Sequence, residues 1–376
     1  MRILHYCPSP LDRRLGTAKV YLEAAAAFRA LGWTADVVGT NDLDVATAST
    51  DRTVRLRAYL QRRAHDYDVV EYEHNCLPFA RTDFSSTTLM VARSVLLSHN
   101  LAGCNIPARP GFVRAIGRLF KGPARRKRIL EAISHGTKTV AESDLANVCN
   151  YDEASELRRH GIADDKIVVF PFGLEEGRRR ELEQVDLKPP EMPCVAFVGT
   201  FDPRKGMRVF PRLVELVVRA VPDVRFRLIG TAGMLSTADE VYAEFPSPLR
   251  PAIDVVPRFE PQELPQLLAT ASLGVFPSLV EGCPFGVLEM LAIGLPVIAF
   301  RVPGPPMLLR DDFLVERNDA DAMAANVIAL LRDRNRLAIE RAAARLRSRD
   351  FDWNEIISRT AQVYEARLRA LRAGRS

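Results

Sequence analysis

Short apolar runs alternate with segments of helical periodicity along most of the chain. Residues 3–7 form the first apolar run. After a loop, Val20, Ala24 and Phe28 recur at helical spacing, and Gly32 is typical of a helix end. Further strands are predicted at residues 34–38, 69–72, 89–92 and 166–170. Such repeated strand–helix units favour a parallel sheet covered by helices.

The pattern breaks at residues 174–193, which are highly charged and end in prolines. They contain little to bury, so we predict a linker there. A second alternating series then begins, with strands predicted at 194–198, 224–229, 253–256, 273–276 and 296–300 and helices at 207–219, at 263–271 and from about 285. We therefore predict an α/β protein of two doubly wound domains, 1–173 and 194–351. Their ligand is expected in the cleft between them, beyond the carboxyl ends of the strands.

Composition narrows the class of protein. The chain has 376 residues, of which 47% are hydrophobic and 26% charged, and this excludes disorder or collagen as the main architecture. Eighteen consecutive uncharged apolar residues occur nowhere, and the first residues do not resemble a signal peptide, so a cytoplasmic protein is expected. The six cysteines and six histidines are scattered, without the spacing of a metal site. The net charge of +5 is too small to indicate a nucleic-acid partner.

The most informative stretch is residues 276–297, FPSLVEGCPFGVLEMLAIGLPV. A predicted strand ends at its start, and a loop with two glycines then leads into a helix near Phe285. The amides at a helix start form an anion site. Glu289 lies about one turn into this helix among apolar residues, where a carboxylate needs a partner such as a ribose diol. The alternative is that Glu289 lies on the helix surface and Glu281 in a loop by chance.

Two glutamates separated by seven residues and followed by Gly-x-Pro-Val resemble the signature of the retaining GT-B glycosyltransferases, the large group 1 family. The resemblance implies the GT-B fold, with two Rossmann-like domains facing a central cleft and a last helix, 352–376, that crosses back to the first domain. It also implies a role for Glu281 at the donor sugar hydroxyls and for Glu289 at the nucleotide ribose. The amides around Phe285, Gly286 and Val287 would hold the donor's phosphate and sugar.

A second segment, FVGTFDPRKG at residues 197–206, directly follows the first strand of the second domain. Arg204 and Lys205 are adjacent cations that can neutralise a diphosphate leaving group. The family usually has Gly-Arg where this chain has Gly199 and Thr200, so Arg204 or another residue must supply that charge. The alternative is an exposed turn, since Asp-Pro and Lys-Gly are common in turns.

In the first domain, the resemblance implies that the loop around Gly16 closes over the donor, although an ordinary strand–helix loop is the alternative. Many relatives carry a histidine near the reacting centre where this chain has Arg93. We therefore consider Arg93, His74 and His99 as candidates beside the reacting centre. The alternative for each histidine is a hydrogen-bonded structural role.

Residues 109–128 contain eight basic side chains and no acidic one. On a helix, Arg114, Arg118 and Lys121 share the face opposite an apolar one, as in helices that lie on anionic lipid. The alternative is a helix packed on the core with a solvated basic face. Aromatic residues do not alternate here as in single-strand binders, so no nucleic acid is expected.

Together these features predict a glycosyltransferase that moves a hexosyl-type group from a UDP- or GDP-linked sugar to a glycan or lipid-linked acceptor. Retention and a role in surface polysaccharide or glycolipid biosynthesis follow from the resemblance. Acidic Asp-x-Asp motifs are not evident near these segments, so no metal and no cofactor is expected. The expected location is cytoplasmic, with peripheral binding to the inner face of the cytoplasmic membrane. Two alternatives are a nucleotide-sugar epimerase on the same fold and a catalytically silent binding subunit.

Overall fold

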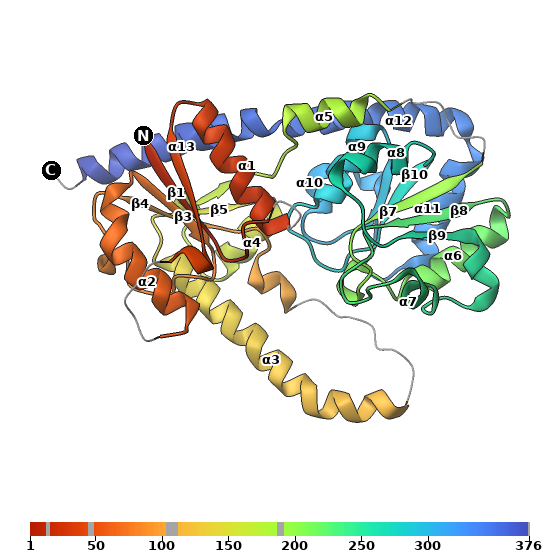
Figure 1. Ribbon diagram of the computed structural model, residues 1–376, viewed down its shortest axis with the longest axis horizontal. Helices are drawn as coiled ribbons and strands as arrows, with labels where there is room; N and C mark the ends of the chain where they lie inside the picture. Colours follow the sequence, from red (N-terminus) through yellow and green to blue (C-terminus); the bar gives the residue numbers. More distant parts are fainter. Residues whose placement is uncertain (13–15, 44–48, 103–111, 186–191, 375–376) are drawn as a thin grey trace. The chain divides into compact units, whose positions relative to one another are not determined.

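The computed structural model describes residues 1–12, 16–43, 49–102, 112–185 and 192–374, with side chains for all of these except 112–125. The described chain forms two compact units (Figure 1). Unit 1 comprises Met1–Gly103, Gly111–Gly173 and Trp353–Ser376. Unit 2 comprises Leu174–Asp352. None of the described helices is both long and apolar enough to span a bilayer.

Unit 1 is built on a six-stranded parallel sheet of order β2-β1-β3-β4-β5-β6. Its strands are β1 (Arg2–Cys7), β2 (Thr34–Gly39), β3 (Val69–Glu73), β4 (Leu89–Arg93), β5 (Leu145–Val148) and β6 (Ile167–Val169). Its α-helices are α1 (Gly16–Ala30), α2 (Arg52–Arg63), α3 (Phe112–Ala141), α4 (Tyr151–Arg159) and α13 (Trp353–Ala373). All residues of β3, β4 and β5 are buried, as in a parallel sheet covered on both faces, and these include the charged residues Glu71, Glu73 and Arg93.

Unit 2 repeats this architecture with the sheet order β12-β11-β10-β7-β8-β9, again parallel. Its strands are β7 (Cys194–Val198), β8 (Arg225–Ile229), β9 (Ile253–Val256), β10 (Leu273–Phe276), β11 (Val297–Phe300) and β12 (Leu314–Val315). Its α-helices are α5 (Glu176–Glu183), α6 (Phe210–Ala220), α7 (Ala238–Tyr242), α8 (Leu264–Leu268), α9 (Phe285–Ile293), α10 (Pro305–Leu308), α11 (Ala320–Arg332) and α12 (Arg334–Ser348).

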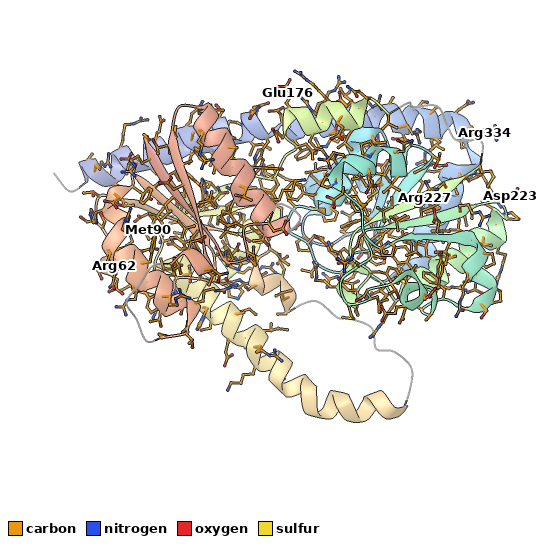
Figure 2. All side chains as sticks on the ribbon, in the orientation of Figure 1. Arg62, Met90, Glu176, Asp223, Arg227 and Arg334 are labelled. Carbon is orange, nitrogen blue, oxygen red and sulfur yellow. The ribbon has the colours of Figure 1, made fainter. Side chains whose placement is uncertain are left out.

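Apolar side chains are mostly buried, and charged side chains are mostly exposed, as in other folded proteins. In Figure 2, Met90 lies within unit 1 on β4, where it is fully buried, whereas Arg62 extends from α2 and is exposed. Asp223 and Arg334 are likewise exposed at the surface of unit 2. The apolar positions seen in the sequence therefore form the interior of two separate sheets.

Among the described residues, the chain leaves unit 1 after Gly173 and returns to it at Trp353, and the unit 2 residues next to these two points lie side by side. The Leu174 amide donates to the Phe351 carbonyl at 2.9 Å, and Leu174 forms an isolated bridge with Asp352. Arg179 forms an ion pair with Asp352 at 3.3 Å. The outgoing and returning segments are thus tied together by both backbone and side-chain contacts.

The structure differs from the linker predicted over residues 174–193, because residues 176–183 form helix α5. The helix has one fully buried apolar residue, Leu182, and it packs against α9. A single apolar contact gives no periodicity, so the sequence pattern did not indicate a helix. The short strand β5 was also missed, since it follows α3 with little change in composition.

Candidate active site

The strand order of unit 2 changes direction between β7 and β10. From β7 the sheet continues through β8 and β9 on one side, and from β10 through β11 and β12 on the other. Ligands of open parallel sheets bind beyond the carboxyl ends of the strands at such a point. The segments that follow β7 and β10 are residues 199–209 and 277–284. They contain the chemistry-bearing motifs of the sequence, so the candidate site lies at this edge of unit 2.

Asp202 organises the segment after β7. Its carboxylate accepts hydrogen bonds from the amides of Arg204 at 2.8 Å and Lys205 at 3.1 Å, which starts a short 3₁₀-helix, Pro203–Lys205. The Thr200 hydroxyl donates to the other Asp202 oxygen at 2.8 Å. Thr200, the residue that stands where the family usually has arginine, is therefore engaged within its own loop. The cations of this segment are Arg204 and Lys205.

Gly206 lets the segments after β7 and β10 approach each other. Its φ is +82°, and a Cβ at this position would lie 2.1 Å from the carbonyl oxygen of Pro277. Next to it, the Leu279 amide donates to the Arg204 carbonyl at 2.8 Å. Only glycine combines this backbone conformation with so close a contact. The sequence Lys-Gly is thus required by packing and is more than an exposed turn.

Lys205 and Glu281 form the central ion pair of the site. Lys205 Nζ donates to Glu281 Oε1 at 2.5 Å, and both side chains are largely buried. The Ser278 hydroxyl donates to the same oxygen, and Arg204 Nη1 lies 3.7 Å from it. Lys205 Nζ also lies 5.1 Å from the centre of the Phe276 ring, within the range of a cation–π contact. Two cations and a hydroxyl therefore surround one buried carboxylate.

Helix α9 begins directly after the Glu281 loop. Its first positions, Phe285 and Gly286, belong to the helix turn whose amides have no earlier carbonyl within the helix. The Val287 amide donates to the Pro284 carbonyl at 3.1 Å, so this third amide is already used inside the helix start. A Cβ at Gly286 would lie 2.9 Å from the carbonyl oxygen of Val198. The glycine therefore allows the start of α9 to pack closely against the end of β7.

Glu289 lies one turn further along α9 and is 9% exposed. Arg178 of helix α5 donates to its Oε1 through Nε at 3.3 Å and Nη2 at 3.2 Å. Arg178 Nη1 also donates to Glu181 at 2.7 Å. The partner of Glu289 in this structure is thus an arginine from the segment that the sequence indicated as a linker.

His74 of unit 1 follows β3 and is almost fully buried. Its Nε2 accepts a hydrogen bond from the Ser98 amide at 2.9 Å, which places the proton on Nδ1. Nδ1 then donates to the Glu73 carboxylate at 2.5 Å. Both ring nitrogens are used inside unit 1, an arrangement that favours the structural alternative for this histidine.

Arg93 at the end of β4 is also buried, with 1% of its surface exposed. It donates to Glu71 Oε2 at 3.3 Å, and its guanidinium lies 5.4 Å from the centre of the Phe172 ring. The Tyr364 hydroxyl of α13 donates to the same carboxylate at 2.5 Å. Burial by itself raises the pKa of Glu71, but Arg93 and His5 outweigh it and lower this pKa to about 2. These contacts give Arg93 a packing role that joins α13 to the sheet.

The remaining candidates of unit 1 are Gly16, His99 and three basic residues of α3. Gly16 begins α1 and is exposed, and residues 13–15 before it lie outside the described residues. His99 Nε2 bonds to the Thr137 hydroxyl at 2.9 Å. Burial and the neighbouring His160 lower the pKa of His99 to about 4. Arg114, Arg118 and Lys121 fall in α3, and their side chains lie outside the described ones.

Part of the chain is similar in sequence to known proteins. The family model of the glycosyl transferases group 1 matches residues 192–333, which include β7, β10 and α9. Over these residues, unit 2 therefore resembles the group 1 glycosyltransferases. A D-inositol 3-phosphate glycosyltransferase of Segniliparus rotundus is 30% identical over 248 residues, covering 61% of this chain and 54% of that protein. The chain thus spans about half the length of the curated relatives that it matches.

Solved structures show that the chain has the GT-B fold. A sucrose-phosphate synthase from Thermosynechococcus elongatus superposes with a TM-score of 0.71 at 18% identity, covering 98% of this chain and 99% of that one. HepE from Anabaena, in complex with UDP-glucose, gives a TM-score of 0.67 at 15% identity, covering 97% and 100%. At such identities the likeness concerns the fold.

Three further residues lie in the candidate site although sequence reasoning gave them no role. Ser278 and Asp202 stood inside the quoted motifs, and a hydroxyl or carboxylate directly after a strand was the available signal. Arg178 carried no such signal, because it lies in a run of three arginines within a charged segment.

Proposed function

We propose that this chain transfers a hexosyl-type group from a nucleotide sugar to a glycan or lipid-linked acceptor. The observation that carries the proposal is the Lys205–Glu281 ion pair beside the start of α9, at the direction change of the unit 2 sheet. HepE, which shares the fold, is a protein seen with UDP-glucose, and this supports a nucleotide-sugar donor.

In this proposal, Lys205 and Arg204 stabilise the negative charge that develops on the departing diphosphate. Both residues are held in place before the donor binds, because the Asp202 carboxylate fixes their backbone and Glu281 fixes the lysine side chain. Glu281 then accepts hydrogen bonds from hydroxyls of the donor sugar, and Glu289 accepts them from the ribose. The first amides of α9 add donors to the phosphate and sugar.

We further propose transfer with retention, in which the leaving diphosphate assists removal of the acceptor proton. The protein then contributes orientation and charge stabilisation rather than a dedicated base. This fits His74, whose two nitrogens are both occupied inside unit 1. We also propose that transfer needs no metal ion, because Lys205 and Arg204 supply positive charge at this position. Surface polysaccharide or glycolipid biosynthesis is the proposed setting.

A peripheral position on an anionic membrane is the last part of the proposal. It rests on the eight basic and no acidic residues over positions 109–128 and on the long helix α3 that contains most of them. Such a helix would hold the chain near a lipid-linked acceptor. The proposed location is therefore cytoplasmic, at the inner face of the membrane.

The deciding experiment incubates the protein with UDP- and GDP-linked hexoses, with and without a bacterial lipid extract, in the presence of EDTA. Free nucleotide and the anomeric configuration of the product are followed by chromatography and NMR. We expect nucleotide release that depends on the lipid extract and is lost in Glu281→Gln but kept in Glu215→Gln, an exposed position on α6. Conversion of one nucleotide sugar into another without release would instead indicate an epimerase. Binding without any conversion would indicate a silent subunit.

A further inference from the structure

Arg178 is held against Glu289 by a helix that is itself firmly anchored in unit 2. Helix α5 packs on α9, and its Leu182 is fully buried. Next to Arg178, Arg179 pairs with Asp352 at 3.3 Å, and Glu183 accepts from Arg349 at 2.9 Å. The backbone of α5 is therefore fixed at several points.

Arg178 provides the Glu289 carboxylate with a positively charged partner. The neighbours of Glu289 on α9, Leu288 and Met290, are fully buried, and an ionised carboxylate in apolar surroundings needs a partner. The guanidinium nitrogens Nε and Nη2 both donate to Oε1. The same contact fixes the rotation of the carboxylate before any ligand arrives.

We infer that Arg178 is a positioning residue for the ribose of the donor, acting through Glu289; this inference rests on the proposed function. Arg178 holds the Glu289 carboxylate in one orientation, so that the ribose hydroxyls meet a preformed acceptor. Preorganisation of this kind increases affinity by reducing the cost of ordering on binding. Helix α5 of unit 2 thereby contributes to nucleotide recognition.

The test uses the full chain and calorimetric titration with UDP and GDP, of which the tighter-binding nucleotide is carried forward together with its 2′,3′-dideoxy form. In Arg178→Ala, we expect the affinity for the nucleotide to fall about tenfold, or ~1.4 kcal/mol. The affinity for the dideoxy form should change less than about twofold, because the missing hydroxyls are the groups through which Arg178 acts. Arg178→Lys keeps the positive charge but lacks the planar guanidinium. Its affinity for the nucleotide should lie between those of the unmodified protein and Arg178→Ala.

Arg180→Ala is the matched control, since Arg180 lies on the same helix, is exposed and pairs only with Glu176 among the described contacts (Figure 2 labels Glu176). It should bind the nucleotide as the unmodified protein does. In a Glu289→Ala background, Arg178→Ala should have no further effect. With the nucleotide sugar as substrate, Arg178→Ala should raise KM more than it lowers kcat.

Equal losses for the nucleotide and its dideoxy form, or a gain in affinity on removing Arg178, would overturn this inference and leave the proposed function standing. If the unmodified protein binds neither UDP nor GDP, the proposed function fails, and the inference fails with it.

Discussion

Lys205 Nζ lies 2.5 Å from Glu281 Oε1, although the two residues are 76 positions apart in sequence. The pairing is possible because β7 and β10 are neighbours in the sheet, so the loops that follow them meet at one edge. A lysine and a glutamate that are both largely buried neutralise each other before any ligand binds. A negatively charged donor then encounters a cation whose position is already fixed.

Lys205→Ala should weaken the binding of the cognate nucleotide about tenfold or more, because a hydrogen bond to a charged group contributes ~1.5–3 kcal/mol. Glu289→Ala should have an effect of similar size through the ribose. Glu281→Ala should reduce turnover more than nucleotide binding, since its proposed partner is the sugar. Calorimetry gives the affinities and nucleotide release gives the turnover.

The control for these variants is Arg219→Ala, which removes a cation from the exposed side of α6. Arg219→Ala should change neither the nucleotide affinity nor the turnover, because exposed ion pairs contribute little to stability. Unchanged nucleotide affinity in both Lys205→Ala and Glu289→Ala would contradict the assignment of the site.

Gly206→Ala should destabilise unit 2 by about 3 kcal/mol or more, as measured by urea unfolding followed by circular dichroism. Part of the effect is the positive φ, which costs an L-residue roughly 1–2 kcal/mol. The rest comes from the Pro277 carbonyl oxygen, which a Cβ would approach to 2.1 Å.

Gly161 separates the two contributions. Its φ is also +82°, but no atom lies within 4 Å of an added Cβ. Gly161→Ala should therefore show the conformational cost alone, about 1–2 kcal/mol. Equal destabilisation at Gly161 and Gly206 would show that the close approach to Pro277 has no energetic weight.

Apolar runs and glycine-containing loops were sufficient to predict most of the two sheets, because buried parallel strands are continuous in composition. The predicted strand at 194–198, for example, has the same bounds as β7. Helix α5 was not predictable in this way, since its stability depends on a single buried leucine and on contacts with α9. Its charged residues resemble a linker until the tertiary partners are known.

Likewise, some residues of the candidate site were predictable from local sequence patterns and others were not. Glu281, Glu289 and Lys205 stand in local patterns, so sequence reasoning selected them. Arg178 reaches Glu289 across 111 positions, and no local pattern encodes that contact. Arg93 was selected from the family resemblance, and no local pattern encodes its contact with the buried Glu71 either.

Glu71→Gln should destabilise unit 1 by about 3–5 kcal/mol at neutral pH, because it leaves the buried Arg93 without its counter-charge. The variant should also be less sensitive to acid. The folded pKa of Glu71 lies at about 2, below its ordinary value of 4.5, so the unfolded chain takes up the proton first. The contribution of the ionised Glu71 to the free energy of unfolding is present above pH 4.5 and is lost as the pH falls towards 2.

Both tryptophans of the chain, Trp33 and Trp353, are buried in unit 1, so tryptophan fluorescence reports on the unfolding of this unit. The difference in unfolding free energy between the unmodified protein and Glu71→Gln should shrink as the pH is lowered through that range. Tyr364→Phe, which keeps the ion pair with Arg93, should retain most of the acid sensitivity. A constant difference across the range would mean that Glu71 does not titrate as described.

Replacing Arg114, Arg118 and Lys121 with glutamine should weaken binding to anionic vesicles. Each basic side chain near such a surface contributes about 1 kcal/mol, so the loss should be roughly 3 kcal/mol. Binding by the unmodified protein should require anionic lipid and should decline as salt rises, because screening acts over about 8–10 Å at moderate ionic strength. Flotation with vesicles at low salt measures both effects.

A variant with the same change in net charge tests whether position matters. Replacement of Arg62, Arg219 and Arg334, which are exposed on α2, α6 and α12, removes three positive charges elsewhere. If α3 carries the interaction, this variant should float nearly as well as the unmodified protein, whereas the α3 variant should remain below the lipid layer. Activity on a soluble acceptor analogue should survive in both, because the residues of the proposed donor site lie in unit 2. If the unmodified protein itself stays in the aqueous fraction at low salt, the basic residues form a solvated face, and the proposal of a lipid-linked acceptor loses its main support.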